Sequence, residues 1–176
     1  MSGEAGVQSQ LGQGSTFWAE LPLAAAEPVP DAVITGPGEV SRLYGARVLM
    51  VEDNPVNMMI AVAMLEHWGV LVSQAFDGRA AVDAVHAAVR EGQPFDAVLM
   101  DVQMPVMGGH EAARELRLHY AADALPIIAL TAAALVSERQ EAFASGMNDF
   151  LTKPIDAPKF RDTLAQHVRK RGTAAE

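Results

Sequence analysis

Five short apolar runs divide the body of this chain, and a longer segment with helical spacing follows each of them. The runs predict strands over Arg47–Val51, Leu71–Ala75, Ala97–Met100, Ile127–Leu130 and Asp149–Leu151. The segments between and after them predict helices over Pro55–Trp68, Arg79–Glu91, Gly109–Tyr120, Ser137–Ser145 and Ala157–Arg169. Strands and helices that alternate in this way predict an α/β fold, in which helices cover both faces of a parallel sheet.

The N-terminal part of the chain has a different pattern. Residues 24–44 are rich in Ala, Pro and Gly without a steady period, which is typical of a linker. This linker separates a short N-terminal piece, 1–23, from the body, 45–171, and residues 172–176 are expected to form a tail.

The first predicted helix is apolar almost all round. One stripe at helical spacing, which is expected to face the core, contains Asn57, Ile60, Ala61, Met64, Leu65 and Trp68. The opposite side contains Met58, Met59, Val62 and Ala63. We expect Met58, Met59 and Val62 to form an outward docking surface, because methionine-rich faces suit adaptable contacts. The alternative is that this second stripe packs under the linker.

Composition narrows the classes of function. The chain has 176 residues, half of them hydrophobic, which is enough for one domain and a short appendage. It has no cysteine, so disulfides and thiolate metal sites are excluded and a cytoplasmic setting is expected. A net charge of −9 argues against nucleic-acid binding, and we expect neither a membrane span nor a signal peptide in this chain. The five histidines show no metal-ligand spacing.

Polar residues stand where four of the predicted strands end. Glu52 and Asp53 follow the first strand, Asp101 the third, Thr131 the fourth and Lys153 the fifth. The carboxyl ends of parallel strands meet at one edge of the sheet, where such folds place their chemistry. Three carboxylates crowded there repel one another, and they suit a hard divalent cation.

Together, the motifs VLMVEDN, FDAVLMDVQMPVMGG, IIALTA and FLTKP resemble the receiver domain of two-component response regulators. The resemblance implies a flavodoxin-like sheet with strand order 2-1-3-4-5. It also implies that Asp101 is the phosphoacceptor, which takes a phosphoryl group from phosphohistidine. The implied ligands of Mg²⁺ or Mn²⁺ are Glu52, Asp53, Asp101 and the backbone carbonyl of Gln103.

The same resemblance assigns the remaining site residues. Lys153 is expected to pair with the phosphoryl group, and Thr131 to donate a hydrogen bond to it. Thr131 and Phe150 form the expected switch, in which Phe150 turns inward when Thr131 moves. The Lys153–Pro154 peptide bond is expected to be cis.

The N-terminal piece GVQSQLGQGSTFWAELPL resembles the last two strands of the ATP-binding domain of sensor histidine kinases. Its glycine-rich turn lacks the lysine of a P-loop, so a hairpin is favoured over a nucleotide site. That family's Asn-containing helix, Asp-x-Gly-x-Gly box and phosphorylatable histidine helix are absent from this sequence. The chain is therefore expected to come from a hybrid histidine kinase but not to bind ATP.

The leading hypothesis is a receiver module that is not an enzyme by itself. It is expected to take the phosphoryl group from the dimerisation and phosphotransfer domain of a histidine kinase and to pass it from Asp101 to a histidine phosphotransfer protein. One alternative is a phosphatase of the haloacid-dehalogenase type, but that family needs a second Asp two residues after the nucleophile, where this chain has Gln103. The other alternative is an interaction module with a dead site, which the set Asp53, Asp101, Thr131 and Lys153 argues against.

Overall fold

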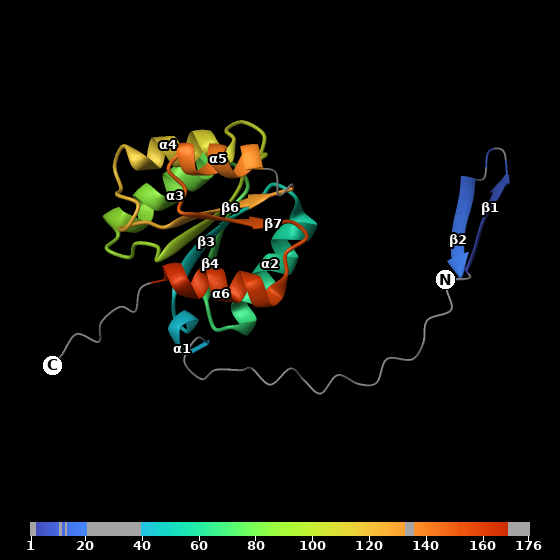
Figure 1. Ribbon diagram of the computed structural model, residues 1–176, viewed down its shortest axis with the longest axis horizontal. Coiled ribbons are helices and arrows are strands. Elements are labelled where there is room, and N and C mark those ends of the chain that lie inside the picture. The colour runs from blue at the N-terminus through green and yellow to red at the C-terminus, as the bar shows by residue number, and fades with distance from the viewer. Residues whose placement is uncertain (1–2, 11, 13, 21–39, 133–135, 169–176) are drawn as a thin grey trace. The chain divides into compact units, whose positions relative to one another are not determined.

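The structure is a computed structural model that describes residues 3–10, 12, 14–20, 40–132 and 136–168. The chain forms two compact units, residues 1–35 and 36–176. In the smaller unit, β1 (Glu4–Gln10) and β2 (Gly14–Glu20) pair antiparallel, as expected for a hairpin (Figure 1). The predicted tail, the Leu-Pro-Leu run and most of the predicted linker lie outside the described residues.

The larger unit contains a parallel sheet of five strands: β3 (Arg47–Val51), β4 (Leu71–Ala75), β5 (Ala97–Asp101), β6 (Ile127–Thr131) and β7 (Asp149–Thr152). Their order is β4-β3-β5-β6-β7, and every neighbouring pair is parallel. Counted within this sheet, the order is 2-1-3-4-5, which confirms the predicted fold class. Three strands run one residue beyond their prediction, so that Asp101 and Thr131 are the last residues of β5 and β6.

Five helices connect and follow these strands: α2 (Pro55–His67), α3 (Gly78–Arg90), α4 (Gly109–Arg117), α5 (Val136–Ala144) and α6 (Ala157–His167). Helices α2 and α6 cover one face of the sheet, and α3, α4 and α5 cover the other (Figure 1). Within the described residues, no helix is long and apolar enough to cross a membrane.

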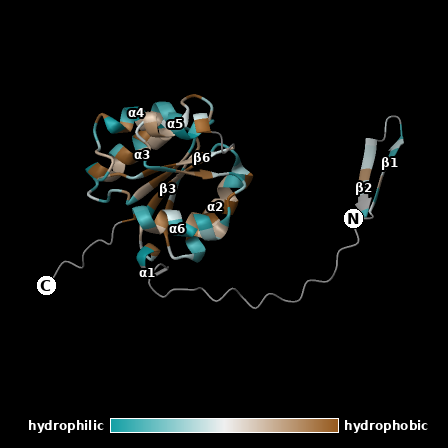
Figure 2. Ribbon diagram, in the orientation of Figure 1, coloured by the Kyte–Doolittle hydropathy of each residue, from teal (hydrophilic) through white to brown (hydrophobic). Residues whose placement is uncertain are grey.

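Successive side chains along a strand point to opposite faces of the sheet, so each strand contributes to the hydrophobic core on both faces. In β3, Val48 and Met50 pack toward α2 and α6, whereas Leu49 and Val51 pack toward the other three helices. All four side chains are fully buried. Because both faces are covered, the inner strands β3, β5 and β6 are mostly apolar, and Figure 2 shows β3 and β6 in brown between the helices.

A short helix, α1 (Val40–Leu43), lies inside the segment predicted as a linker. The Leu43 side chain is fully buried in the same core cluster as α2 and α6. The packed body therefore includes Leu43, two residues before the start that was expected for it. This contact could not be predicted, because a single leucine in a segment rich in Ala, Pro and Gly gives no helical spacing of apolar residues.

The rotation of α2 about its axis also differs from the prediction. Met58 is 3% exposed and packs in the core with Ala61 and Leu65, so it is not an outward docking residue. Ile60, predicted to be buried, is 45% exposed, and Met59 is 66% exposed. A helix that is apolar almost all round has no hydrophobic asymmetry from which its buried face can be predicted.

Candidate functional site

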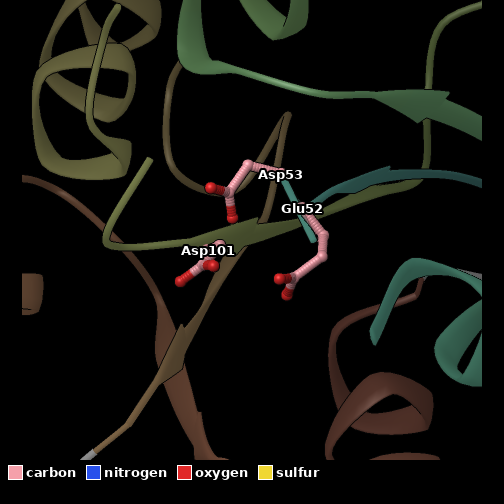
Figure 3. A group of neighbouring side chains, drawn as sticks. All are labelled: Glu52, Asp53 and Asp101. Atoms are coloured by element: carbon pink, nitrogen blue, oxygen red, sulfur yellow. The ribbon is translucent and has the colours of Figure 1, made fainter. Parts of the chain in front are cut away.

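Three carboxylates gather at the carboxyl edge of the sheet. Asp101 ends β5, and Glu52 and Asp53 follow directly on the adjacent strand β3. One oxygen from each lies within 4.8 Å of the others, and Figure 3 shows the three side chains around one space. Glu52 and Asp101 are buried, whereas Asp53 is exposed. A ring of carboxylate oxygens with one solvent-facing member fits a hard divalent cation, which prefers oxygen ligands and often keeps water.

Lys153, which follows β7, neutralises two of these carboxylates. Its Nζ donates to Glu52 Oε2 at 2.5 Å and to Asp101 Oδ2 at 2.7 Å. Burial, together with the nearby charge of Glu52, raises the pKa of Asp101 above its ordinary value, although the hydrogen bond and charge of Lys153 lower it. Burial by itself lowers the pKa of Lys153, but hydrogen bonds to Asp101 and Glu52 raise the pKa above its usual value. The Lys153–Pro154 bond is cis, as expected.

The start of α2 fixes Glu52. The Asn57 amide donates to Glu52 Oε1 at 3.0 Å, and the Asn54 backbone N–H donates to the same oxygen at 3.3 Å. The Asn54 side chain also caps α2 by accepting from the N–H of Val56 at 2.9 Å. Asn57 was expected in the mainly apolar stripe of this helix, and its contact with Glu52 was not predicted. Its signal is its position as the third residue of α2, in the first turn of the helix that directly follows Glu52.

The loop after β5 approaches the site closely. The Gln103 N–H donates to Asp101 Oδ1 at 3.2 Å, and the Gly109 N–H donates to the Val102 carbonyl at 3.0 Å. A Cβ on Gly109 would lie 2.1 Å from the Asp101 carbonyl oxygen, so only glycine fits where α4 begins. Val106 in this loop has a φ of 66° and is 86% exposed, a strained conformation for a β-branched residue.

Thr131 and Phe150 lie on β6 and β7, which pair with each other. Thr131 is buried, and its hydroxyl donates a hydrogen bond to the carboxylate of Glu138 on α5. Phe150 is half-buried, with the guanidinium of Arg139 5.2 Å and the ammonium of Lys159 5.9 Å from its ring centre. Glu138 and Arg139 were not singled out from the sequence. Both follow a loop and carry no local signal that they face the site.

The structure thus brings the predicted Glu52, Asp53, Asp101 and Lys153 together, and it places Thr131 at the end of the next strand. The geometry defines a buried acidic site with a fixed ammonium, on an open parallel α/β sheet. The chain belongs to the response regulator receiver domain family, whose model matches residues 48–165.

Curated relatives are sensor kinases. The chain is 40% identical over 168 residues to the sensor protein GacS of Pseudomonas syringae pv. syringae, covering 93% of this chain and 18% of that protein. It is 34% identical over 171 residues to the aerobic respiration control sensor protein ArcB of Escherichia coli K12, covering 93% of this chain and 21% of that one. The chain thus spans about a fifth of the length of these relatives.

Solved structures agree with this family. The receiver domain of sensor histidine kinase PA1611 from Pseudomonas aeruginosa PAO1, which holds a magnesium ion in its active-site cleft, is 40% identical with a TM-score of 0.62. That match covers 70% of this chain and 98% of PA1611's receiver chain. The Saccharomyces cerevisiae complex of the phosphotransfer protein Ypd1 with the Ssk1 receiver domain matches at 29% identity and a TM-score of 0.62, over 71% and 90% of the two chains.

Proposed function

We propose that this chain is a phosphoacceptor module in a phosphorelay, and that Asp101 accepts the phosphoryl group from a phosphohistidine. The observation that carries this proposal is the pair of contacts from Lys153 Nζ to Glu52 and Asp101, with Asp53 beside them. This arrangement places a cation beside the acceptor carboxylate, where phosphoryl charge would arrive.

In the proposed reaction, a carboxylate oxygen of Asp101 attacks phosphorus in line with the P–N bond of the phosphohistidine. The new O–P bond forms as the P–N bond breaks, and the bonding electrons leave with the imidazole. Lys153 then exchanges its contact with Asp101 for a phosphoryl oxygen, and Thr131 donates to another. Transfer of this kind depends mainly on positioning and charge neutralisation.

We propose that Glu52, Asp53, Asp101 and the Gln103 carbonyl hold Mg²⁺ or Mn²⁺, Glu52 through water. The donor set fits, because it offers oxygen atoms only and includes one exposed carboxylate. When bound, the metal neutralises charge that develops on the phosphoryl oxygens. The magnesium ion in the PA1611 receiver domain supports this assignment.

Acetyl phosphate tests acceptance without a protein partner. With Mg²⁺, the chain should gain one phosphoryl mass, and Asp101→Asn should gain none. A chain that stays unlabelled would favour an interaction module. Release of many phosphate ions per protein molecule would favour a phosphatase. The phosphatase alternative lacks its acid, because Gln103 stands two residues after Asp101.

For the partner, we propose docking of the histidine-bearing domain or phosphotransfer protein on the exposed side of α2. Val56, Met59 and Ile60 are all exposed there, with Val62 half-buried beside them. Ile60 also lines a groove of about 130 Å³ with Asn57, Lys153, Pro154 and Ile155. An apolar groove that contains the lysine of the acceptor site suits a helix that presents a phosphohistidine.

Two phosphodonors separate docking from chemistry. Ile60→Glu should leave labelling by acetyl phosphate intact and should reduce transfer from a phosphohistidine protein at least about tenfold, since it buries a carboxylate in the interface. Leu118→Glu is the matched control, because Leu118 is 79% exposed and lies at the end of α4, outside this groove. Equal transfer rates in both variants would refute docking at α2.

We also propose that the hairpin β1–β2 is a remnant of a kinase ATP-binding domain and that the parent is a hybrid histidine kinase. The matches to GacS and ArcB cover 93% of this chain, beyond the receiver region at 48–165. The hairpin leaves Val7 and Phe17 exposed, as expected of strands taken from a larger sheet. Deleting residues 1–35 should leave phosphorylation of the receiver unit by acetyl phosphate unchanged. Loss of phosphorylation would refute the independence of the receiver unit from the hairpin.

A further inference from the structure

The hydroxyl of Thr131 is already engaged. It donates a hydrogen bond to the carboxylate of Glu138, which lies in the first turn of α5. A hydroxyl has a single proton to donate. While Glu138 accepts that proton, Thr131 cannot donate to a phosphoryl oxygen on Asp101.

We propose that Glu138 is a positioning residue that holds Thr131 in the unphosphorylated state, so that formation of the acyl phosphate requires Thr131 to leave Glu138. The inference rests on the proposed function and adds a second acceptor that competes for the same proton. Both acceptors are anionic, so each would form a charge-assisted hydrogen bond with the hydroxyl, and a weaker acceptor at position 138 would favour the phosphoryl group.

Arg139, the residue after Glu138 in α5, contacts the other predicted switch residue, Phe150. The Arg139 guanidinium lies 5.2 Å from the ring centre of Phe150 and 5.6 Å from that of Phe143. The rings of Phe143 and Phe150 meet edge to face at 6.4 Å. Two consecutive residues of α5 therefore contact the two predicted switch residues, Thr131 and Phe150. Movement of either switch residue must break a contact with this turn.

The test measures how tightly the full chain binds beryllofluoride, a stable mimic of a phosphoryl group, in the presence of Mg²⁺. Fluorine NMR follows the bound ion, and thermal unfolding checks that each variant folds. The variants are Glu138→Gln and Glu138→Ala, each in the wild-type chain and in Thr131→Ala. Glu141→Gln is the matched control. Glu141 is exposed on the same helix, and its substitution removes the same charge as Glu138→Gln.

We expect Glu138→Ala to bind beryllofluoride about tenfold more tightly than wild type, with a smaller gain for Glu138→Gln, because a neutral acceptor holds the hydroxyl less strongly. In the Thr131→Ala background, neither change should have an effect beyond that of Glu141→Gln. This dependence on Thr131 separates positioning from a general effect of charge or stability.

Two results would overturn the inference. One is an equal gain from Glu141→Gln, and the other is a gain from Glu138→Ala that persists without Thr131. Either would mean that the site responds only to net charge. Failure of the proposed function looks different, because wild-type protein would then bind no beryllofluoride and no variant would restore binding.

Discussion

Removal of the Lys153 ammonium tests how the acidic site is held together. Lys153→Met keeps the side-chain length and removes the charge that contacts Glu52 at 2.5 Å and Asp101 at 2.7 Å. At these distances and an effective dielectric constant of about 20, each gross attraction is about 6 kcal/mol. Desolvation offsets most of it, and loss of one partner of a buried pair costs about 3–5 kcal/mol. The Lys153 side chain is 20% exposed, so we expect a loss near 3 kcal/mol.

The pH range follows from the sign of the pKa shift. The pKa of Lys153 is raised in the folded protein, so its contribution to stability is complete below its ordinary value of 10.5 and is lost only as the pH rises through the raised value. Urea unfolding near neutral pH therefore measures the whole effect. Without metal, Lys153→Met should unfold at lower urea than wild type, and Mg²⁺ should restore part of the difference because it neutralises the same carboxylates.

Lys159→Met is the control for a change of charge alone, since Lys159 is exposed. It should change the free energy of unfolding by no more than about 0.5 kcal/mol. If Lys153→Met were as stable as Lys159→Met without metal, the ammonium would not hold the carboxylates, and the electrostatic account of the site would be wrong.

Three further predictions concern other parts of the fold. Met58→Ala should lose about 2–5 kcal/mol in urea unfolding, whereas Met59→Ala should lose little, because only Met58 is buried; equal losses would contradict the rotation of α2. Val106→Gly should raise the melting temperature, since glycine relieves a positive φ at an exposed residue, and a lower melting temperature would argue against strain. Burial lowers the pKa of His110, so its stabilising contribution is present above 6.5 and is lost as the pH falls through the lowered value. As the pH falls from about 7.5 to 5.5, His110→Gln should therefore lose less free energy of unfolding than wild type. Identical dependence of the unfolding free energy on pH in both proteins would show that His110 does not contribute to it.

The fold and the acidic cluster were predictable because their signals are local and repeated. Each strand is a short apolar run, and the carboxylates follow such runs directly, so a parallel sheet must bring them to one edge. Glu52, Asp53, Asp101 and Lys153 meet as predicted. Resemblance supplied the strand order, which periodicity alone could not distinguish.

Contacts that depend on tertiary placement were not predictable. The rotation of α2 depends on which apolar side fits the sheet, so Met58 and Ile60 exchanged their expected environments. Glu138 reaches Thr131 only because α5 begins beside the end of β6, and no spacing rule links residues across that loop. Leu43 was missed because a single apolar residue outside a periodic segment resembles a linker residue.

Chemical mapping of the acceptor tests the central claim most directly. An acyl phosphate on an aspartate is reduced by borohydride to homoserine, whereas phosphate esters of serine and threonine survive. After incubation with acetyl phosphate and Mg²⁺, reduction, proteolysis and peptide sequencing by mass spectrometry, homoserine should appear at position 101 and at no other aspartate. Homoserine at Asp53, or a label that resists borohydride, would contradict the assignment of Asp101 as the phosphoacceptor.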